Sequence, residues 1–553
     1  MKTTPFNLLN RRSFLSRSTL AASAIVSGAS FRLALSARAQ STRPGNPLRL
    51  LPEWSGGTLT AAPATVAVWP GYPGPVLTLN GSIPGPTIRA RRGEWFTARI
   101  DNQLGEPLVL HWHGILAPER MDGHPRDGVA SGQSYGVHFP IRNRAGTYWY
   151  HAHTDALTAS QAYRGMAGAF IVEDPAEAAL DLPAGNHDLV LVLTDKRSNA
   201  ARQLIYSPTM MDTMSGYLGD VVLVNGTPDA WLSVDRGRYR LRLVNGSNAR
   251  IFKLGLSAGR ALQLIATDGG LFPAPVTVTT LMLAPGQRAD IVVDFAPYSV
   301  GQSVVLHSFS FPASGGMMGG PRQGTEFDVL RFYVDGAATG APPVPATLSA
   351  ITPLDPALAQ RTRVFTLAMS GMVHTINGLL FSLNRVDFTV PFGQLELWEI
   401  RNTSTEFHPM HVHGALFQVS YRSSTTTLAP EDTGWKDTVL VSPNETVRLL
   451  VNFDSYPGVF LFHCHNLEHE DSGMMLNFEV TGPPPVKLET SRAGTNHVIS
   501  YPQSAADYTL EHTPRLGTNA VWQPASQAPV LDDAALKFTV PRTGTGFFRL
   551  RKP

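Results

Sequence analysis

Cysteine, net charge and long apolar runs are all scarce in this chain of 553 residues. A single cysteine excludes an intrachain disulfide. A formal net charge of +2 gives no reason to expect nucleic acid or a strongly acidic partner. Extended helical periodicity is also rare, whereas 49 Gly and 43 Pro with frequent turn dipeptides favour an all-β protein of many short strands. At roughly 150 residues per domain, the length predicts three or four domains.

The first 39 residues are typical of an export signal. Asn10-Arg11-Arg12-Ser13-Phe14-Leu15 resembles a twin-arginine motif, and Ala37-Arg38-Ala39 offers a small-residue cleavage site. The uncharged run between them, Ser18 to Phe31, is shorter than the ~20 residues that a membrane-spanning helix needs. The alternative is an uncleaved anchor or a chance arginine pair. We expect a twin-arginine signal peptide over 1–39, no transmembrane segment in the mature chain, and a periplasmic or secreted location.

Alternation of apolar and polar residues between Gly/Pro turns divides the rest of the chain. We expect three β-sandwich domains, at 45–175, 187–335 and 351–483. A small β-module of unknown role should follow at 486–553. It is either a surface-attachment element or a further plain sandwich.

The third region repeats the first in outline. Asn102 precedes His111 by nine residues, and Asn402 precedes His411 by nine. Gly146 likewise precedes His151 by five residues, as Gly458 precedes His463. Shared offsets of this kind indicate an internal duplication at the scale of a domain.

The stretch from His463 to Met474 contains the only cysteine, Cys464, between two histidines. Successive side chains of a strand point to opposite faces, so His463 and His465 would face one way and Cys464 the other. Cys464, His469 and Met474 supply a thiolate, an imidazole and a thioether, which lack only a second imidazole to match a blue-copper ligand set. The alternative is a buried free cysteine beside ordinary core histidines.

Three further segments place histidines two residues apart, so that both rings of a pair lie on one face of a strand. One such pair alone is weak support for a metal site. His408 lies an odd number of residues from His411, so it can face away from it and supply the second imidazole for Cys464. The pairs are His111/His113, His151/His153 and His411/His413.

These four segments, in this order, resemble the multicopper oxidases, the family of laccases and bacterial cuprous oxidases, over about 45–483. The resemblance implies three cupredoxin-like Greek-key domains and four copper ions. It assigns the type 1 copper to His408, Cys464, His469 and the axial Met474. His111 and His411 would hold the type 2 copper. The type 3 pair would be held by His113, His151, His153, His413, His463 and His465.

The resemblance also implies an oxidoreductase that takes single electrons at the type 1 copper and reduces O₂ to water at the trinuclear cluster. Asp122 and Glu470 match acidic positions used for proton delivery, although a solvated surface charge is the plainer interpretation of either. Ser404 and Glu406 stand where cuprous oxidases carry Met and Asp ligands for a labile copper. Phenols or aromatic amines are therefore favoured as substrates over metal ions.

There are four rival interpretations. The chain could be a metal-ion (cuprous) oxidase in copper tolerance or a non-catalytic periplasmic copper-binding protein that stores the metal. An exported scaffold that keeps the fold without its ligands is disfavoured because all ten histidines of these segments and the cysteine are present. A copper nitrite reductase is disfavoured because that enzyme uses no type 3 pair. Methionines such as Met210, Met211, Met214 and Met372 line a substrate mouth in one interpretation and fill core or loops in the plainer one.

Overall fold

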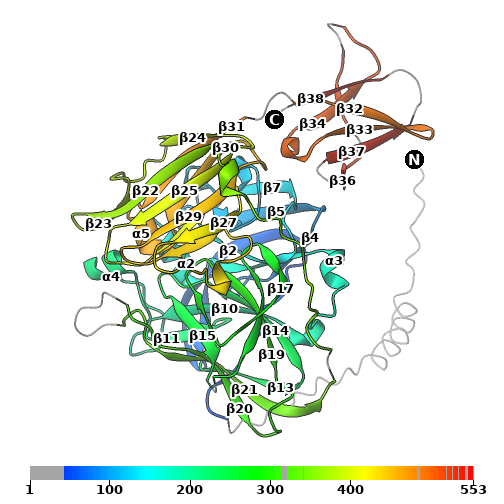
Figure 1. Cartoon of the computed structure of the whole chain (residues 1–553). Helices are drawn as coiled ribbons and strands as arrows, with labels where there is room; N and C mark the ends of the chain where they lie inside the picture. Colours follow the sequence, from blue (N-terminus) through cyan, green and yellow to red (C-terminus); the bar gives the residue numbers. More distant parts are fainter. Residues whose placement is uncertain are drawn as a thin grey trace, which may run out of the picture. The chain divides into compact units, whose positions relative to one another are not determined.

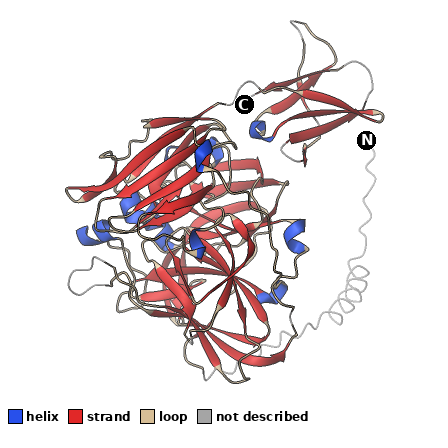
Figure 2. Cartoon of the chain, in the orientation of Figure 1, coloured by secondary structure: helices blue, strands red, loops and turns tan. Residues whose placement is uncertain are grey.

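A computed structural model of the chain describes residues 43–257, 259–313, 321–340, 342–482, 486–517, 520–525, 527–532, 535–541 and 546–551. The predicted signal peptide, 1–39, lies outside these residues. The chain divides into Met1–Gly45 and Asn46–Pro553, and the fold described below is that of the second unit. The prediction of an all-β protein is confirmed, because strands dominate the described residues and helices are short (Figures 1 and 2).

The first sandwich consists of two sheets that close on a common core. Its strand β5 shows the expected alternation, with Phe96, Ala98 and Ile100 buried and Thr97 and Arg99 exposed. One sheet has the order β3 (Tyr72–Leu79), β2 (Gly57–Trp69), β5 (Trp95–Asn102), β7 (Ser134–Pro140). The other has the order β4 (Ile88–Arg91), β9 (Ala167–Glu173), β8 (Gly146–Ala152), β6 (Leu110–His111).

The second sandwich includes a strand from the start of the chain, because β1 pairs in parallel with β13. Its first sheet has the order β1 (Asn46–Pro47), β13 (Ala230–Arg236), β21 (Phe327–Ala338), β20 (Ser303–Ser308), β15 (Phe252–Leu256), β18 (Thr280–Leu283). Its second has the order β12 (Thr227–Pro228), β11 (Val221–Val224), β10 (Asp188–Lys196), β14 (Arg238–Asn245), β19 (Arg288–Asp294), β16 (Leu262–Thr267), β17 (Gly270–Val278).

The third sandwich carries the cysteine at the end of β30. One sheet has the order β23 (Val373–Ile376), β22 (Arg361–Ser370), β25 (Leu395–Asn402), β29 (Thr446–Asn452), β27 (Phe417–Arg422). The other has the order β24 (Phe388–Pro391), β31 (Met475–Thr481), β30 (Gly458–Cys464), β26 (His408–Val412), β28 (Thr438–Val441).

The carboxy-terminal module also has two sheets. Ile499, Tyr501 and Phe538 belong to the same buried hydrophobic cluster as Trp398 and Phe478 of the third sandwich, so the module packs against that sandwich. Its role in surface attachment stays a prediction. The sheets have the orders β32 (Glu489–Ala493), β33 (Asn496–Pro502), β37 (Ala535–Pro541), β36 (Val530–Asp532) and β35 (Gln523–Pro524), β34 (Thr509–Thr513), β38 (Phe547–Arg551).

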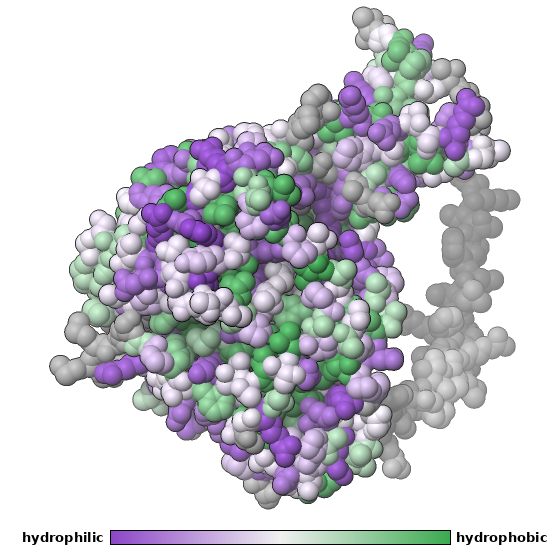
Figure 3. Space-filling model, in the orientation of Figure 1, coloured by the Kyte–Doolittle hydropathy of each residue, from purple (hydrophilic) through white to green (hydrophobic). Residues whose placement is uncertain are grey.

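Short helices join the strands. No helix among the described residues is long and apolar enough to span a membrane. On the face drawn in Figure 3, hydrophilic and hydrophobic residues are interspersed. The α-helices are α2 (Thr158–Arg164), α3 (Pro175–Ala178), α4 (Met210–Ser215) and α5 (Leu467–Asp471). The 3₁₀ turns are η1 (Glu119–Met121), η2 (Pro125–Asp127), η3 (Gly185–His187), η4 (Pro356–Leu358), η5 (Pro430–Asp432) and η6 (Gln503–Ala505).

Candidate metal centre

Two equivalent strand pairs position the histidines. In the first sandwich β6 pairs with β8 so that His111 lies opposite His151. In the third sandwich β26 pairs with β30 so that His411 lies opposite His463. The repeat offsets in the sequence thus correspond to the same register in two sheets.

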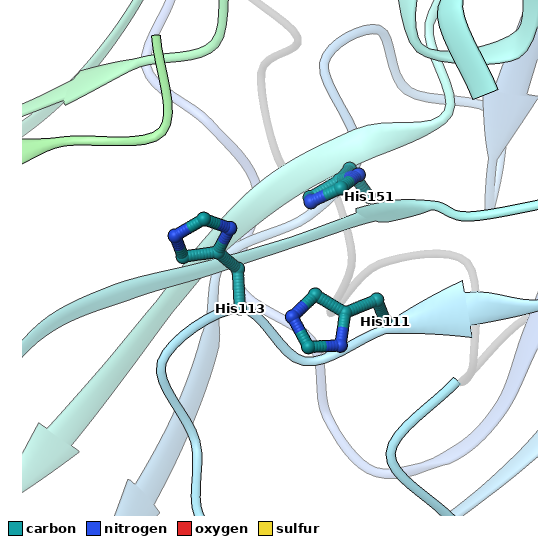
Figure 4. A group of neighbouring side chains, drawn as sticks. All are labelled: His111, His113 and His151. Carbon is teal, nitrogen blue, oxygen red and sulfur yellow. The ribbon is translucent and has the colours of Figure 1, made fainter. Parts of the chain in front are cut away.

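The eight histidines of the two outer sandwiches converge on one buried pocket. Figure 4 shows His111, His113 and His151, whose ligand nitrogens lie within 4.8 Å of one another. The same limit holds within two further groups, His111/His411/His413 and His153/His413/His463. The Nε2 atoms are 3.3 Å apart between His111 and His411, 3.0 Å between His413 and His463, and 3.4 Å between His465 and His151. A ring of nitrogens at this spacing can surround several metal ions.

Hydrogen bonds on the outer side of the rings fix their tautomers. His111 Nδ1 donates to the carbonyl oxygen of Asp122 at 2.6 Å, and His411 Nδ1 donates to that of Asp437 at 2.8 Å. His413 Nδ1 donates to the Asp122 carboxylate at 2.7 Å. With Nδ1 protonated, Nε2 keeps a free lone pair toward the pocket, which is how histidine ligands are usually oriented.

His113 is oriented the other way round. Its Nε2 lies 3.0 Å from Asp437 Oδ1 and 3.1 Å from Thr438 Oγ1, and its Nδ1 finds no hydrogen-bond partner among the described residues. His153 has neither ring nitrogen bonded, and His465 Nδ1 is also unpartnered. Buried polar atoms are nearly always satisfied, so orphaned imidazole nitrogens in one pocket fit a bound metal. Imidazole is a ligand that copper prefers.

Burial keeps these rings neutral. Desolvation, followed by repulsion from neighbouring rings, lowers the pKa of most of the imidazoles well below the ordinary value, and that of His151 to about 4. A metal ligand must be deprotonated, so a pocket that disfavours imidazolium is prepared for a metal. The rings so affected are His111, His113, His153, His411, His413 and His465.

The second group is formed by His408, Cys464 and His469, which lie together in the third sandwich and are buried. Cys464 Sγ is 3.5 Å from His408 Nδ1 and 3.6 Å from His469 Nδ1. Burial raises the pKa of the Cys464 thiol. Copper that binds here must therefore displace a proton from sulfur as it forms the thiolate bond.

Hydrogen bonds also orient this triad. His408 Nε2 lies 2.9 Å from Ser404 Oγ, and His469 Nε2 donates to the carbonyl oxygen of Met214 at 2.8 Å. Both rings therefore turn Nδ1 toward the sulfur. Met474, expected as the axial ligand, is buried, and its carbonyl accepts the Cys464 backbone N–H at 3.1 Å.

The two predicted carboxylates are buried beside the pocket and are not solvated surface charges. Glu470 Oε2 lies 3.2 Å from His463 Nδ1, and its Oε1 lies 3.6 Å from His153 Nε2. Asp122 is held by His413, and burial raises its pKa well above the ordinary value.

Sequence reasoning missed contributions from the second sandwich. Arg288 forms an ion pair with Asp437, which in turn contacts His113. Gly286 has φ +83°, and a Cβ there would lie 3.0 Å from atoms of His113 and His465, so only glycine fits this close approach. These contacts could not be predicted from residue spacing, because a lone Arg or Gly is not part of any metal-ligand motif.

Helix α5 connects the cysteine loop to the other two sandwiches through carboxylates. The Asp471 oxygens accept the backbone N–H groups of Thr158 and Ala159 at the start of α2, both at 3.0 Å. The Glu468 oxygens accept from Tyr217 N at 2.9 Å and Asn248 Nδ2 at 2.8 Å. The segment that follows Cys464 is thus fixed to both neighbouring sandwiches.

Comparison with known proteins agrees with this geometry. Sequence profiles described as "Multicopper oxidase" match residues 61–177, 188–317 and 352–483. The chain is 34% identical to a bilirubin oxidase of Albifimbria verrucaria over 425 residues, 73% of each chain. It is 31% identical to a laccase of Bacillus subtilis over 466 residues, 73% of this chain and 90% of the laccase. The structure of the McoA multicopper oxidase of Aquifex aeolicus superposes with a TM-score of 0.74 at 36% identity, covering 80% of this chain and all of McoA.

Proposed function

The chain belongs to the multicopper oxidase family, and on that premise we propose that it oxidises phenols or aromatic amines one electron at a time and reduces O₂ to water. Its membership makes it an oxidoreductase whose family binds copper. Four copper ions, one of type 1, one of type 2 and two of type 3, belong to the proposal.

One observation carries this function. Cys464 Sγ faces the nitrogens of His408 and His469, while its two chain neighbours, His463 and His465, enter the eight-histidine pocket. A single tripeptide therefore joins both candidate centres through covalent bonds. A copper-storage protein has no need of such a junction, whereas an oxidase that moves single electrons between centres does.

The side chains divide the ligand roles. His408, Cys464, His469 and Met474 would hold the type 1 copper, and His111 with His411 the type 2 copper. Copper bound there supplies reversible one-electron chemistry and a site for O₂. The type 3 pair would be held by His113, His151, His153, His413, His463 and His465.

The chain's own groups exclude water and handle protons. All ten histidines and Cys464 are buried, so their ligand atoms are shielded from bulk solvent. Glu470, whose carboxylate oxygens find no hydrogen-bond partner among the described residues, can donate a proton toward the pocket beside His463 and His153. Asp122 can do the same beside His413. Water formation consumes protons, which buried carboxyl groups at the pocket wall can relay.

The residues outside the type 1 triad favour an organic reductant. Ser404 Oγ is hydrogen-bonded inward to His408 Nε2 and to Asn402 Oδ1, so it is not free to bind an external metal ion. Burial raises the pKa of Glu406 to about 7, which weakens it as an anionic ligand at neutral pH. Metal-ion oxidation is the second candidate, favoured by the exposed methionines Met210 and Met211 on α4.

We also propose that the protein works in the periplasm or outside the cell after twin-arginine export. The support is the motif around Arg11 and Arg12, and the advantage of loading copper before transport of a folded chain. Replacing both arginines with lysine in the full chain should keep the protein in the cytoplasm, and normal export of that variant would contradict the proposal.

The decisive experiment is oxygen uptake by the copper-loaded protein with a panel of phenols, aromatic amines, Cu(I) and Mn(II). We expect uptake with phenols or amines and a blue absorption from the thiolate. Uptake only with Cu(I) would establish the metal-ion alternative. Copper binding without uptake on any reductant would leave a non-catalytic copper-binding protein.

A further inference from the structure

A histidine outside the proposed ligand set lies against both type 1 imidazoles. His374, on β23, is buried, and its ring centroid is 4.1 Å from that of His469 and 4.8 Å from that of His408. It supplies no atom to the triad that faces the sulfur. It nonetheless packs against the two imidazoles that are proposed to hold the type 1 copper.

His374 and His469 share one acceptor. The carbonyl oxygen of Met214 accepts His374 Nε2–H at 2.9 Å and His469 Nε2–H at 2.8 Å. Met214 lies in the last turn of α4, where carbonyl groups have no partner within the helix. Both lone pairs of this carbonyl are therefore used to bind the helix to the type 1 site.

Helix α4 covers the site as a fixed element. Thr209 and Asp212 form a capping box at its start, and Asp212 pairs with Arg197. At its end Gly216, with φ +94°, packs against Asn466 and Ala249. The outer side of the helix exposes Met210 (65%) and Met211 (38%), whereas His469 is buried. A reductant in solvent can thus touch α4 but not the His469 ring.

A role in packing alone does not account for His374. Its Nδ1 is buried and finds no hydrogen-bond partner among the described residues, which is a cost that leucine at this position would avoid. The hydrogen bond from His374 Nε2–H to the Met214 carbonyl explains why a histidine occupies this position. Besides His469, it is the second ring of the third sandwich that bonds to this carbonyl.

We propose that His374 is a positioning residue that holds the Met214 carbonyl, and with it helix α4, against His469, so that electrons from a reductant arrive across α4. The inference rests on the proposed function and names the surface that the reductant uses. In each step a phenol would lose one electron and pass its hydroxyl proton to solvent water, and copper held by the triad would supply the one-electron acceptor. The hydrogen bond Met214 C=O···H–Nε2 His469 is the last contact before that ligand.

Two substitutions at this position separate donation from packing. Gln at 374 keeps an amide N–H that can reach the Met214 carbonyl, whereas Leu fills the space and removes the donor. His307→Leu, at a partly exposed histidine paired with Asp328 in the second sandwich, is the control for loss of a surface histidine. Neither of the two residues changed, His374 and His307, is a proposed copper ligand.

The first readout needs no copper. Hydrogen exchange of the backbone amides of residues 209–217 is compared in the copper-free full chain. We expect His374→Leu to exchange up to about tenfold faster in this segment, because losing one hydrogen bond lowers the free energy of local opening, and His374→Gln to resemble the parent. Equal exchange in His374→Leu and the parent overturns the proposal.

The second readout is bleaching of the blue absorption by a phenol without O₂ in the copper-loaded protein. We expect His374→Leu to keep the blue band but bleach about tenfold more slowly or worse, and His374→Gln to recover the rate. A glutamine variant as slow as the leucine variant overturns the proposal, as does an unchanged rate in both. If no phenol bleaches the parent, the proposed substrate class fails, and the exchange measurement still decides the role of His374.

Discussion

Arg288 and Asp437 form a fully buried bidentate ion pair, with Nη1 2.7 Å from Oδ1 and Nη2 2.5 Å from Oδ2. Arg288 begins β19 in the second sandwich, and Asp437 precedes β28 in the third. The same Oδ1 lies 3.0 Å from His113 Nε2 of the first sandwich. One carboxylate therefore joins all three sandwiches at the wall of the metal pocket.

Asp437→Asn should destabilise the copper-free protein strongly, because the buried Arg288 loses its bidentate partner and keeps the more distant Asp268, whose Oδ1 is 3.7 Å away. Breaking a buried pair costs about 3–5 kcal/mol. Thermal unfolding of the variant should show this loss as a lower midpoint than that of the parent. Copper content should fall as well, since His113 loses the group that orients it. Asp328→Asn is the matched control: its pair with Arg331 is exposed, and it should cost at most about 1 kcal/mol. Equal effects of the two substitutions would show that the buried pair has no special role.

Cys464→Ser should abolish the blue absorption and leave one copper fewer per chain. A serine hydroxyl is a poor copper ligand compared with thiolate, and the junction to His463 and His465 would end in an empty site. Oxygen uptake should be lost while the histidine pocket keeps its metal. Absorption spectroscopy, metal analysis and oxygen consumption together check this. A variant that stays blue would place the sulfur outside the type 1 centre.

Glu470→Gln should slow O₂ reduction by ~100-fold, the range for loss of a positioned proton donor, and leave reduction of the type 1 site by substrate intact. Stopped-flow reduction without O₂ and steady-state turnover with O₂ separate the two steps. Glu479→Gln, an exposed residue on β31, is the control for removing a carboxylate nearby in sequence. Unchanged turnover in Glu470→Gln would remove this residue from the mechanism.

Lys196 should make stability depend on pH above neutrality. Its Nζ donates to the Tyr163 carbonyl at 2.7 Å, and burial lowers its pKa to about 8. In the unfolded chain the pKa is about 10.4, so above pH 8 the unfolded state binds more protons and the free energy of unfolding rises with pH.

Between pH 8 and pH 10.5 the free energy of unfolding of the parent should rise relative to that of Lys196→Met by ~3 kcal/mol, at 1.36 kcal/mol per pKa unit. Parallel thermal unfolding of both copper-free proteins across this range measures it, because the variant lacks the titrating group and cancels the other contributions. A constant difference between the two proteins at every pH would contradict the lowered pKa.

The histidine and cysteine spacings allowed much of the site to be predicted. His-X-His on a strand and Cys464 between two histidines are local patterns whose geometry follows from the alternation of side chains along a strand. The odd offset from His408 to His411 likewise predicted that the two rings face opposite ways. The structure places His408 beside Cys464, and it places His411 in the eight-histidine pocket. Strand alternation and turn residues were sufficient for the all-β fold class.

What escaped prediction depends on contacts between distant segments. The Met214 carbonyl that binds His374 and His469 is a backbone group, which has no sequence signature. Arg288 and Gly286 gain their roles only when the second sandwich packs against the other two. Asp437 gains its contact with His113 only when the first and third sandwiches meet. Even Glu470, singled out from its place in the sequence, could not be distinguished from a solvated charge until its burial was known.

The ligands of the pocket are contributed from distant parts of the chain: His111 and His411, whose Nε2 atoms lie 3.3 Å apart, are separated by 300 residues. During synthesis on a ribosome, the amino-terminal half of the pocket exists long before its complement is made. A polypeptide that ends before His411 carries only four of the eight imidazoles, and one that ends before His463 carries six, so the complete pocket requires nearly all of the third sandwich to have been made. Truncation of the third sandwich should therefore remove metal sites in the first sandwich as well, because the two share one ring of ligands.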